Sequence, residues 1–205
     1  MLLLMSAAHQ THVAHRHPQL GRLVHPPDQY ARIAETAAAG IPWAADNFAF
    51  AGFDANAYTR MLAAIVGLPG CRFVVIPDTV GDAGATRMRY RRWYDTVKAT
   101  GQPVAYAAQD GVTASGIPWD QIDALFIGGT DQFKLGPGVA KLVEWAHGYD
   151  KWVHMGRVNS ARRARYAATL GCDSFDGTAF SKWRDRYLQD GVAWAASHQQ
   201  LRMGF

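Results

Sequence analysis

Acidic and amide side chains stand at the ends of four short apolar stretches of the sequence. They are Asp46 and Asn47, Asp78, Gln109, and Asp176. A carboxylate can act as a nucleophile, as a general acid or base, or as an acceptor for the N–H edge of a ligand. A glutamine amide adds a donor and an acceptor. These residue types predict a site that binds a polar ligand and performs nucleophilic or acid–base chemistry on it.

Glycines stand at the ends of two further apolar stretches. One of them ends in Gly128 and Gly129, and the other ends in Met155 and Gly156. Because glycine has no side chain, a flat ligand can lie directly against its backbone N–H group. A planar, polar heterocycle such as a purine suits this combination of acids, amides and glycines. The alternative for any single aspartate is a helix cap or a turn residue.

The elements that must position these residues follow from the alternation of apolar and amphipathic segments. Continuous apolar runs of this length are typical of strands buried on both faces of a parallel sheet. The predicted strands span residues 2–7, 21–26, 42–47, 72–78, 103–110, 124–129, 151–156 and 173–178. Residues that can cap a helix precede several of the segments between them, namely Asp28, Asp54, Asp82 and Ser160.

Eight strands alternating with helices predict an α/β fold, specifically a compact (β/α)8 TIM-like barrel formed by residues 1–205 as a single domain. An open, doubly wound sheet is the structural alternative. In a barrel of this kind the active site lies at the carboxyl ends of the strands. The acids, amides and glycines all stand at those ends, so the barrel would gather them on one rim.

Composition narrows the class of protein. Of the 205 residues, 49% are apolar and 19% are charged, which is typical of an ordered globular domain. The only cysteines are Cys71 and Cys172, which excludes a disulfide framework and a four-cysteine zinc site. The opening residues 1–9 are too short to span a membrane and lack the pattern of a signal peptide. We therefore expect a cytoplasmic protein, in the host cytoplasm if a phage encodes it.

The motifs at the strand ends resemble those of one known superfamily. The stretches AADNFAF, VIPD, AAQDG, FIGGT, VHMGRV and GCDSFDGT, between about residues 40 and 180, occur in the order found in tRNA-guanine transglycosylases. That superfamily includes the queuine-inserting tRNA enzymes and DNA-acting relatives that place 7-deazaguanines in phage and bacterial DNA. The resemblance implies a pentosyltransferase that exchanges one nucleobase for another and needs no cofactor.

The resemblance also assigns roles to individual residues. Asp176 matches the aspartate that attacks the anomeric carbon of the sugar and holds a covalent glycosyl intermediate, and Asp46 matches the acid that binds the base and handles protons. A carboxylate is suited to the first role because loss of a purine builds oxocarbenium character on the sugar. The residues that match the base pocket are Asn47, Asp78, Gln109, Gly128, Gly129, Met155 and Gly156.

Departures from the family pattern favour DNA over tRNA as the polymer. The tRNA enzymes carry a zinc subdomain after the nucleophile, whereas 29 residues follow Asp176 here and none is a cysteine. The stretch GTAFSKWRDR replaces the family's proline-threonine-arginine stretch. We therefore expect a compact, phage-type form that resembles the DNA-guanine transglycosylases, acts on DNA and a free 7-deazaguanine base, and requires the target base to flip out of its stack.

Basic residues supply candidate contacts to the nucleic acid. The net charge is +4, and arginines are interleaved with aromatic residues in the stretches 87–94, 156–166 and 181–187. Arginines neutralise phosphates, and aromatic rings can stack on bases. The alternative is a solvated helix face with a core-facing aromatic side. The strongest candidates follow the seventh predicted strand directly; they are Arg157, Arg162, Arg163 and Arg165.

A histidine-rich tract follows the first predicted strand. The tract contains His9, His12, His15 and His17, and it can bind a transition metal or form a polar loop. We expect no metal at the site itself.

The alternative functions are a tRNA-guanine transglycosylase, a DNA glycosylase, a non-catalytic nucleic-acid-binding subunit on the same barrel, and, more weakly, a phosphate-binding sugar enzyme. A protein partner or a homodimer is compatible with each of them.

Overall fold

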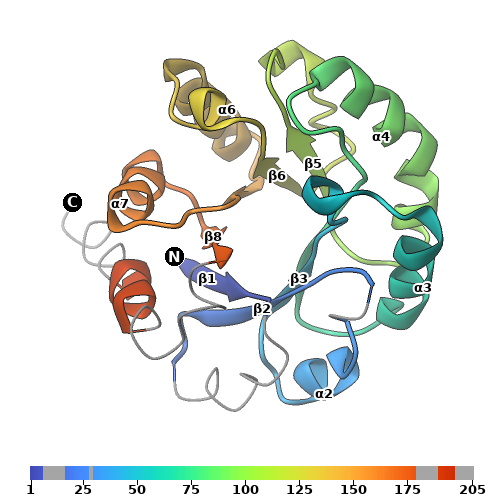
Figure 1. Ribbon diagram of the computed structural model, residues 1–205. Helices are drawn as coiled ribbons and strands as arrows, with labels where there is room; N and C mark the ends of the chain where they lie inside the picture. Colours follow the sequence, from blue (N-terminus) through green and yellow to red (C-terminus); the bar gives the residue numbers. More distant parts are fainter. Residues whose placement is uncertain (7–16, 28–29, 179–188, 197–205) are drawn as a thin grey trace.

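Eight parallel strands close into a barrel in which each strand pairs with the next and β8 pairs with β1 (Figure 1). The computed structural model describes residues 1–6, 17–27, 30–178 and 189–196. The predicted (β/α)8 barrel is therefore confirmed and the open sheet is excluded. The strands are β1 (Leu2–Met5), β2 (Leu20–Val24), β3 (Trp43–Ala45), β4 (Cys71–Val75), β5 (Val104–Ala108), β6 (Ala124–Ile127), β7 (Trp152–Met155) and β8 (Ser174–Asp176).

The helices lie around the outside of the barrel (Figure 1). They are α2 (Ile33–Ala38), α3 (Ala55–Ile65), α4 (Ala83–Lys98), α5 (Asp131–Lys134), α6 (Pro137–Gly148) and α7 (Ala161–Leu170), with short 3-10 turns η2 (Ala49–Ala51) and η3 (Ala114–Gly116). Residues 189–196 are also helical. None of the helices in the described part of the chain has both the length and the hydrophobicity that crossing a bilayer requires.

Strand alternation divides the core into two layers. In β1, Leu3 and Met5 pack with helix residues such as Tyr58 and Met61, so their side chains point outward to the helix layer. The other set, which includes Leu4, contains strand residues alone and fills the barrel interior. Successive side chains of a strand point to opposite faces, so this alternation decides which residues of a strand can reach the cavity.

Three of the four predicted helix caps are confirmed. Asp54 accepts hydrogen bonds from the N–H groups of the first turn of α3, Asp82 does so for α4, and Ser160 for α7. Such caps satisfy backbone donors that have no partner within the helix. Asp28 lies outside the described residues. The residue at the N-cap of α2 is Arg32, which has a left-handed backbone and makes no side-chain capping bond, so this helix begins later than the sequence predicts.

Candidate active site

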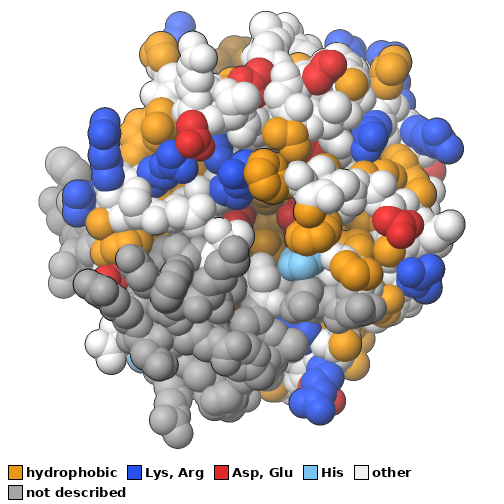
Figure 2. Space-filling view, in the orientation of Figure 1, with side chains coloured by type: hydrophobic (Ala, Val, Ile, Leu, Met, Phe, Trp, Pro, Cys, Tyr) orange, Lys and Arg blue, Asp and Glu red, His pale blue; other side chains and the backbone are white. Residues whose placement is uncertain are grey.

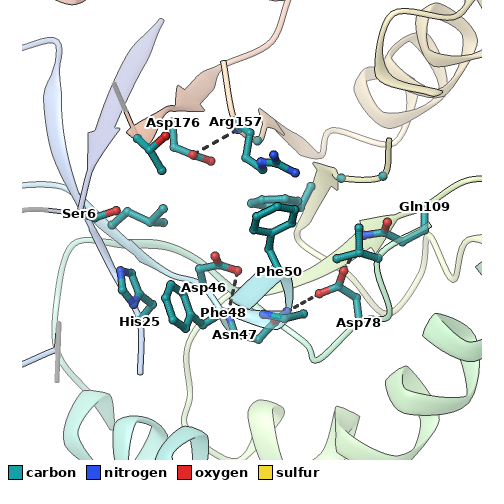
Figure 3. A pocket seen from close by; sticks show the side chains of 18 of the residues that line it. Ser6, His25, Asp46, Asn47, Phe48, Phe50, Asp78, Gln109, Arg157 and Asp176 are labelled. Carbon is teal, nitrogen blue, oxygen red and sulfur yellow. Dashed lines mark hydrogen bonds between the residues drawn. The ribbon is translucent and has the colours of Figure 1, made fainter. Parts of the chain in front are cut away.

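A cavity of about 470 Å³ opens at the carboxyl ends of the strands (Figure 3). This volume lies within the range of small-molecule sites. Seen along the barrel, a hollow lies near the middle of the face, with acidic atoms inside it and hydrophobic side chains at its edge (Figure 2). Most of the predicted site residues line it: Asp46, Asn47, Asp78, Gln109, Gly128, Gly129, Gly156, Arg157 and Asp176.

Asp176 ends β8 and faces the cavity with only 9% of its surface exposed. One carboxylate oxygen, Oδ2, lies 2.9 Å from Nε2 of His154. The other, Oδ1, accepts a hydrogen bond of 3.2 Å from the backbone N–H of Arg157. The carboxylate is therefore held from two sides while it stays in contact with the cavity. This is the placement that a nucleophile requires.

Asp46 follows β3 and lies deep in the same cavity. Its pKa is raised to about 7, mainly by burial and also by the charges of Asp78 and Asp176, and hydrogen bonds from the backbone N–H groups of Asn47 and Phe48 oppose the shift. A carboxyl group with a pKa near neutrality is present in both protonation states at physiological pH. Such a group can both donate and accept a proton during one catalytic cycle.

Asp78 follows β4 and is held by two side-chain amides. Asn47 Nδ2 donates to Asp78 Oδ1 over 2.7 Å, and Gln109 Nε2 donates to Asp78 Oδ2 (Figure 3). Burial raises the pKa of Asp78, and the hydrogen bond from Asn47 opposes that shift. Gln109 Oε1 in turn accepts from the backbone N–H of Gly81 at 2.9 Å. The group is rigid, and it presents a carboxylate and an amide to the cavity.

Asn47 lines the cavity, but its polar atoms already have partners within the protein. Its Nδ2 group donates to Ile76 O over 3.1 Å as well as to Asp78, and its Oδ1 accepts from the N–H of Ala49 at 2.7 Å. An amide nitrogen has two hydrogens, and both are used. The structure thus gives Asn47 a role in positioning Asp78, and direct contact with a substrate stays a prediction.

The glycines at the strand ends are required by close packing. A Cβ atom on Gly128 would lie 2.4 Å from Gln109 Nε2, and one on Gly156 would lie 2.8 Å from Phe126 Cζ. Gly129 has a left-handed backbone with φ of +76°, and a Cβ there would lie 2.6 Å from the Asp110 carboxylate. Because these positions have no side chain, their backbone forms part of the cavity wall.

Met155 does not lie in the cavity, which corrects the sequence prediction. Its side chain belongs to the outer layer of the core, between the strands and the helices. Its neighbour His154 points to the barrel interior instead and contacts Asp176. The prediction was wrong because successive side chains of a strand point to opposite faces, and Met155 is on the outer face.

Aromatic residues line the mouth of the cavity, and the sequence analysis assigned them no role. His25, after β2, stacks on Phe48 with ring centroids 4.2 Å apart and planes within 3°. Phe50 is 64% exposed, and the Arg157 guanidinium lies over its ring. Phe48 and Arg157 both have left-handed backbones, which side chains other than glycine adopt at a cost. The DNFAF motif contains both phenylalanines, but phenylalanine is equally typical of a hydrophobic core, so residue type alone does not assign them to the cavity.

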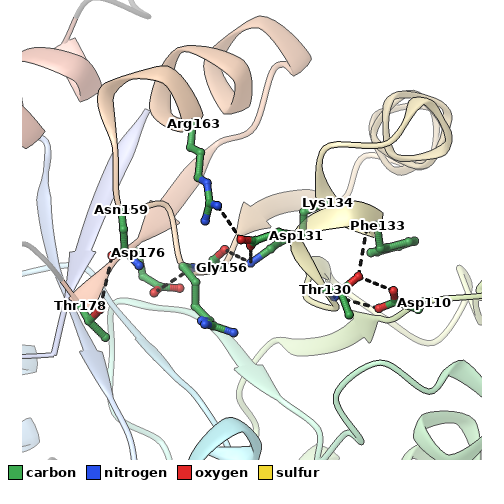
Figure 4. A network of polar contacts seen from close by, with 11 residues as sticks. Asp110, Thr130, Asp131, Phe133, Lys134, Gly156, Asn159, Arg163, Asp176 and Thr178 are labelled. Atoms are coloured by element: carbon green, nitrogen blue, oxygen red, sulfur yellow. Dashed lines mark hydrogen bonds and ion pairs between the residues drawn. The ribbon is translucent and has the colours of Figure 1, made fainter.

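Lys134 is a second residue that the sequence analysis missed. It lies in α5 after β6, lines the cavity, and is 4% exposed. Its Nζ donates to Gly156 O over 3.2 Å and lies 3.6 Å from Asp131, which also binds Arg163 (Figure 4). Burial lowers its pKa, as does the nearby charge of Arg157. Lys134 adds a buried cation to the wall that carries Asp176.

The predicted nucleic-acid-binding arginines have different surroundings. Arg157 lies at the cavity itself. Arg162 and Arg165 project from α7 into solvent. Arg163 donates to Asp131 over 2.6 Å, so part of its hydrogen-bonding capacity is already used (Figure 4). Figure 2 shows a group of Lys and Arg side chains to the upper left of the hollow and further ones along the right edge of the face.

The two other basic stretches offer less support for nucleic-acid contact. In the stretch 87–94, Tyr90 is buried and Trp93 packs against the core, so its aromatic residues are structural. The stretch 181–187 lies outside the described residues. His9, His12 and His15 also lie outside them. Across the described ranges, no group of three His, Cys, Asp or Glu side chains is placed to hold a metal ion.

Comparisons with known proteins establish the fold and leave the activity open. No protein-family model matches the sequence. No curated protein matches it either. Among solved structures, the chain is similar to 3-hexulose-6-phosphate synthase from Salmonella typhimurium, with a TM-score of 0.58, 14% sequence identity, and coverage of 97% of this chain and 100% of the other. At this level of identity the similarity shows a shared TIM-barrel architecture and says nothing of the reaction.

Proposed function

We propose that the protein is an enzyme that exchanges guanine in DNA for a 7-deazaguanine base through a covalent intermediate on Asp176. The observation that carries the proposal is the content of one cavity. The Asp176 carboxylate, which hydrogen bonds hold in place, lines this cavity together with Asp46, a carboxyl group of pKa about 7. The hydrogen-bonded pair of Asp78 and Gln109 lines it as well. A nucleophile, a proton-transfer group and a base-recognition edge are the three components that base exchange requires.

In the first half of the reaction, the guanine leaves. A lone pair of an Asp176 carboxylate oxygen attacks C1′ of the flipped nucleotide, and the C1′–N9 bond breaks. The electron pair of that bond leaves with the base, and Asp46 in its protonated form supplies the proton that makes guanine a neutral leaving group. The products of this half are free guanine, an aspartyl-glycosyl ester and the Asp46 carboxylate.

In the second half, a 7-deazaguanine enters and the ester is resolved. The Asp46 carboxylate removes the N9 proton of the incoming base, and the N9 lone pair attacks C1′. The bond between C1′ and the Asp176 oxygen breaks, and its electrons return to the carboxylate. Both acids end in the protonation states in which they began. A pKa of Asp46 near 7 supports this role because both of its forms are populated at neutral pH.

Asp78 and Gln109 are suited to recognise the guanine-like edge. A carboxylate accepts hydrogen bonds from the N1–H and exocyclic amine that guanine and 7-deazaguanines share, and an amide N–H can donate to the O6 carbonyl. The hydrogen bonds from Asn47 and Gln109 fix the orientation of Asp78 before the ligand arrives. Such preorganisation lowers the entropic cost of binding. The exposed ring of Phe50 offers a face on which the base can stack.

The experiment that tests the proposal is incubation of the protein with a labelled 7-deazaguanine and three polymers: duplex DNA, single-stranded DNA and tRNA. We expect label to enter DNA with release of one guanine for each base incorporated. Label in tRNA alone would show that the substrate is tRNA and not DNA. Release of guanine without incorporation would make the protein a glycosylase. Binding of DNA without either reaction would make it a non-catalytic subunit.

A further inference from the structure

Inside the barrel, a row of polar side chains runs from the amino end of β7 to the cavity. Trp152 and His154 are two residues apart on β7, and Ser174 and Asp176 are two apart on β8. The barrel register pairs His154 with Ser174. Trp152 Nε1 and His154 Nδ1 each lie 2.8 Å from Ser174 Oγ, and His154 Nε2 lies 2.9 Å from Asp176 Oδ2.

The hydrogen-bonding chemistry of these groups gives the row one direction. The indole N–H of Trp152 can only donate, so Ser174 Oγ accepts from it. Within the part of the chain that the structure describes, the other partner of this Oγ is His154 Nδ1, so the buried hydroxyl hydrogen is satisfied by donating to that nitrogen. An imidazole that accepts at Nδ1 carries its proton on Nε2 and donates it to Asp176. The row then ends in an imidazole N–H group that donates to the Asp176 carboxyl group.

The surroundings hold the imidazole in place. His154 is 0% exposed, and its ring centroid lies 5.1 Å from that of Phe73 and 4.8 Å from that of Phe126. Small-barrel interiors are usually filled by branched apolar side chains. Here the strands β7 and β8 place polar groups in the interior instead, and burial of a polar group is unfavourable unless it is hydrogen-bonded. Each member of the row meets that condition through its neighbour.

We propose that Ser174 and His154 position Asp176 for nucleophilic attack, an inference that rests on the proposed function. The bond from His154 to Oδ2 and the bond from the Arg157 N–H to Oδ1 fix the plane of the carboxylate. The carboxylate held in this way lines the cavity. His154 contacts the nucleophile and not the substrate, so it is a positioning residue. The arrangement follows the logic of catalytic triads, in which a buried third group fixes the tautomer of the second.

The first test needs no activity and uses the whole protein. Nitrogen-15 NMR of the histidine side chains, with the His154 signals assigned by their loss in His154→Gln, reports which ring nitrogen carries the proton. At neutral pH we expect a neutral ring with the proton on Nε2. A proton on Nδ1 alone, or a doubly protonated ring, would overturn the proposal because neither species fits the directed row. Ser174→Ala should leave the proton on Nε2, because Asp176 still accepts from that nitrogen, and should shift the Nδ1 signal, because Nδ1 loses its hydrogen-bond partner.

The second test measures the effect on turnover. Removing an outer partner that orients a metal-binding side chain costs roughly 10- to 100-fold in affinity or activity, and we expect a similar factor here. We expect Ser174→Ala and His154→Leu to lower kcat for base exchange by that factor, with the KM for the free base unchanged, because the row touches Asp176 and not the base pocket. His154→Gln, whose amide can still donate to Asp176, should recover part of the loss. Trp152→Phe, which removes the indole donor to Ser174, should lower kcat as well, and Trp145→Phe, at a 48% exposed position of α6, is its control.

The two tests separate this inference from the proposed function. If wild-type protein exchanges bases and the row variants fold but retain wild-type kcat, the positioning role is wrong and the function stands. If the Nε2–H tautomer is found and no base is exchanged with any polymer, the proposed function is wrong and the directed row stands as a property of the fold. Circular dichroism establishes which variants fold, and the wild-type tautomer decides the proposal if none does.

Discussion

The guanidinium of Arg157 lies 3.6 Å from the centroid of the Phe50 ring, across the mouth of the cavity. Arg157 follows β7 and Phe50 follows β3, strands that stand four positions apart in the closed order of eight. The contact therefore joins opposite sides of the barrel mouth. A cation over an aromatic face is attractive, and a nucleobase presents a similar flat partner. A base that enters the cavity can replace the guanidinium on this ring or stack beside it.

We expect Phe50→Ala to weaken binding of the free base. Stacking of a base on an aromatic side chain contributes roughly 1–3 kcal/mol, so the KM for the free base should rise by about 5- to 150-fold. Steady-state kinetics with increasing base concentration measure the change. Met88→Ala is the matched control, since Met88 is 70% exposed on α4. An unchanged KM in Phe50→Ala would place the base elsewhere in the cavity.

We expect Asp46→Asn to stabilise the protein at high pH. The folded-state pKa of Asp46 is about 7, above the value of about 4 for an unfolded aspartate. The folded state therefore holds the proton more tightly, and wild-type stability falls as pH rises from about 4 to about 7. The neutral Asn avoids this loss, so its advantage in free energy of unfolding should grow by at most about 1.4 kcal/mol per pH unit across that window.

Urea unfolding at a series of pH values measures that difference. Asp95→Asn, at an exposed position of α4, controls for the removal of one negative charge. If the difference between wild type and Asp46→Asn is the same at pH 5 and pH 8, the raised pKa is refuted. The loss of base exchange that we also expect for Asp46→Asn is then not a matter of stability, since the variant is the more stable protein.

Gly128→Ala should damage base recognition through Gln109. The added Cβ would lie 2.4 Å from Gln109 Nε2, so the amide must leave its place beside Asp78. We expect a stability loss of about 1–3 kcal/mol from overpacking, together with a higher KM for the free base. Gly138→Ala is the control, because no heavy atom lies within 4 Å of its added Cβ. Wild-type KM in Gly128→Ala would remove Gln109 from the recognition edge.

The exposed arginines of α7 should contribute to binding of the polymer. Arg162 and Arg165 project into solvent from this helix, and each phosphate contact adds about 0.9 to the salt slope of duplex binding. The double substitution Arg162→Ala with Arg165→Ala should weaken binding to all DNA sequences alike and lower that slope by up to about 2. The same double change at Arg91 and Arg92 of α4 is the control. An equal slope for the α7 variant and wild type would place the DNA on another face.

The fold could be predicted from the sequence because its signals are local and repeated. The predicted strands 72–78 and 103–110 contain the continuous apolar runs 73–77 and 103–108, since both faces of a barrel strand are buried. Asp54, Asp82 and Ser160 cap their helices through bonds that span three residues. The start of α2 was not predictable in this way, because its N-cap position is Arg32, which has no capping chemistry.

The site was only partly predictable, and the limit is geometric. Asp176, Asp46 and Asp78 were found because polar residues at strand ends are conspicuous. Met155 was assigned to the cavity although it faces the helix layer, because an apolar run does not show which of two adjacent residues points inward. The hydrogen-bond partners of Asn47 and the position of Lys134 in the cavity wall depend on contacts between segments distant in sequence. Such contacts leave no periodic signal.

Detection of the covalent intermediate is the most direct test of the central claim. A DNA oligonucleotide is incubated with the protein, the mixture is quenched in denaturant during turnover, and the adduct is mapped by mass spectrometry. We predict a sugar-linked DNA adduct on the peptide that contains Asp176, and no adduct or exchange with Asp176→Asn, whose fold is checked by circular dichroism. Base exchange by wild type without an adduct at Asp176, or wild-type exchange by Asp176→Asn, would contradict the account.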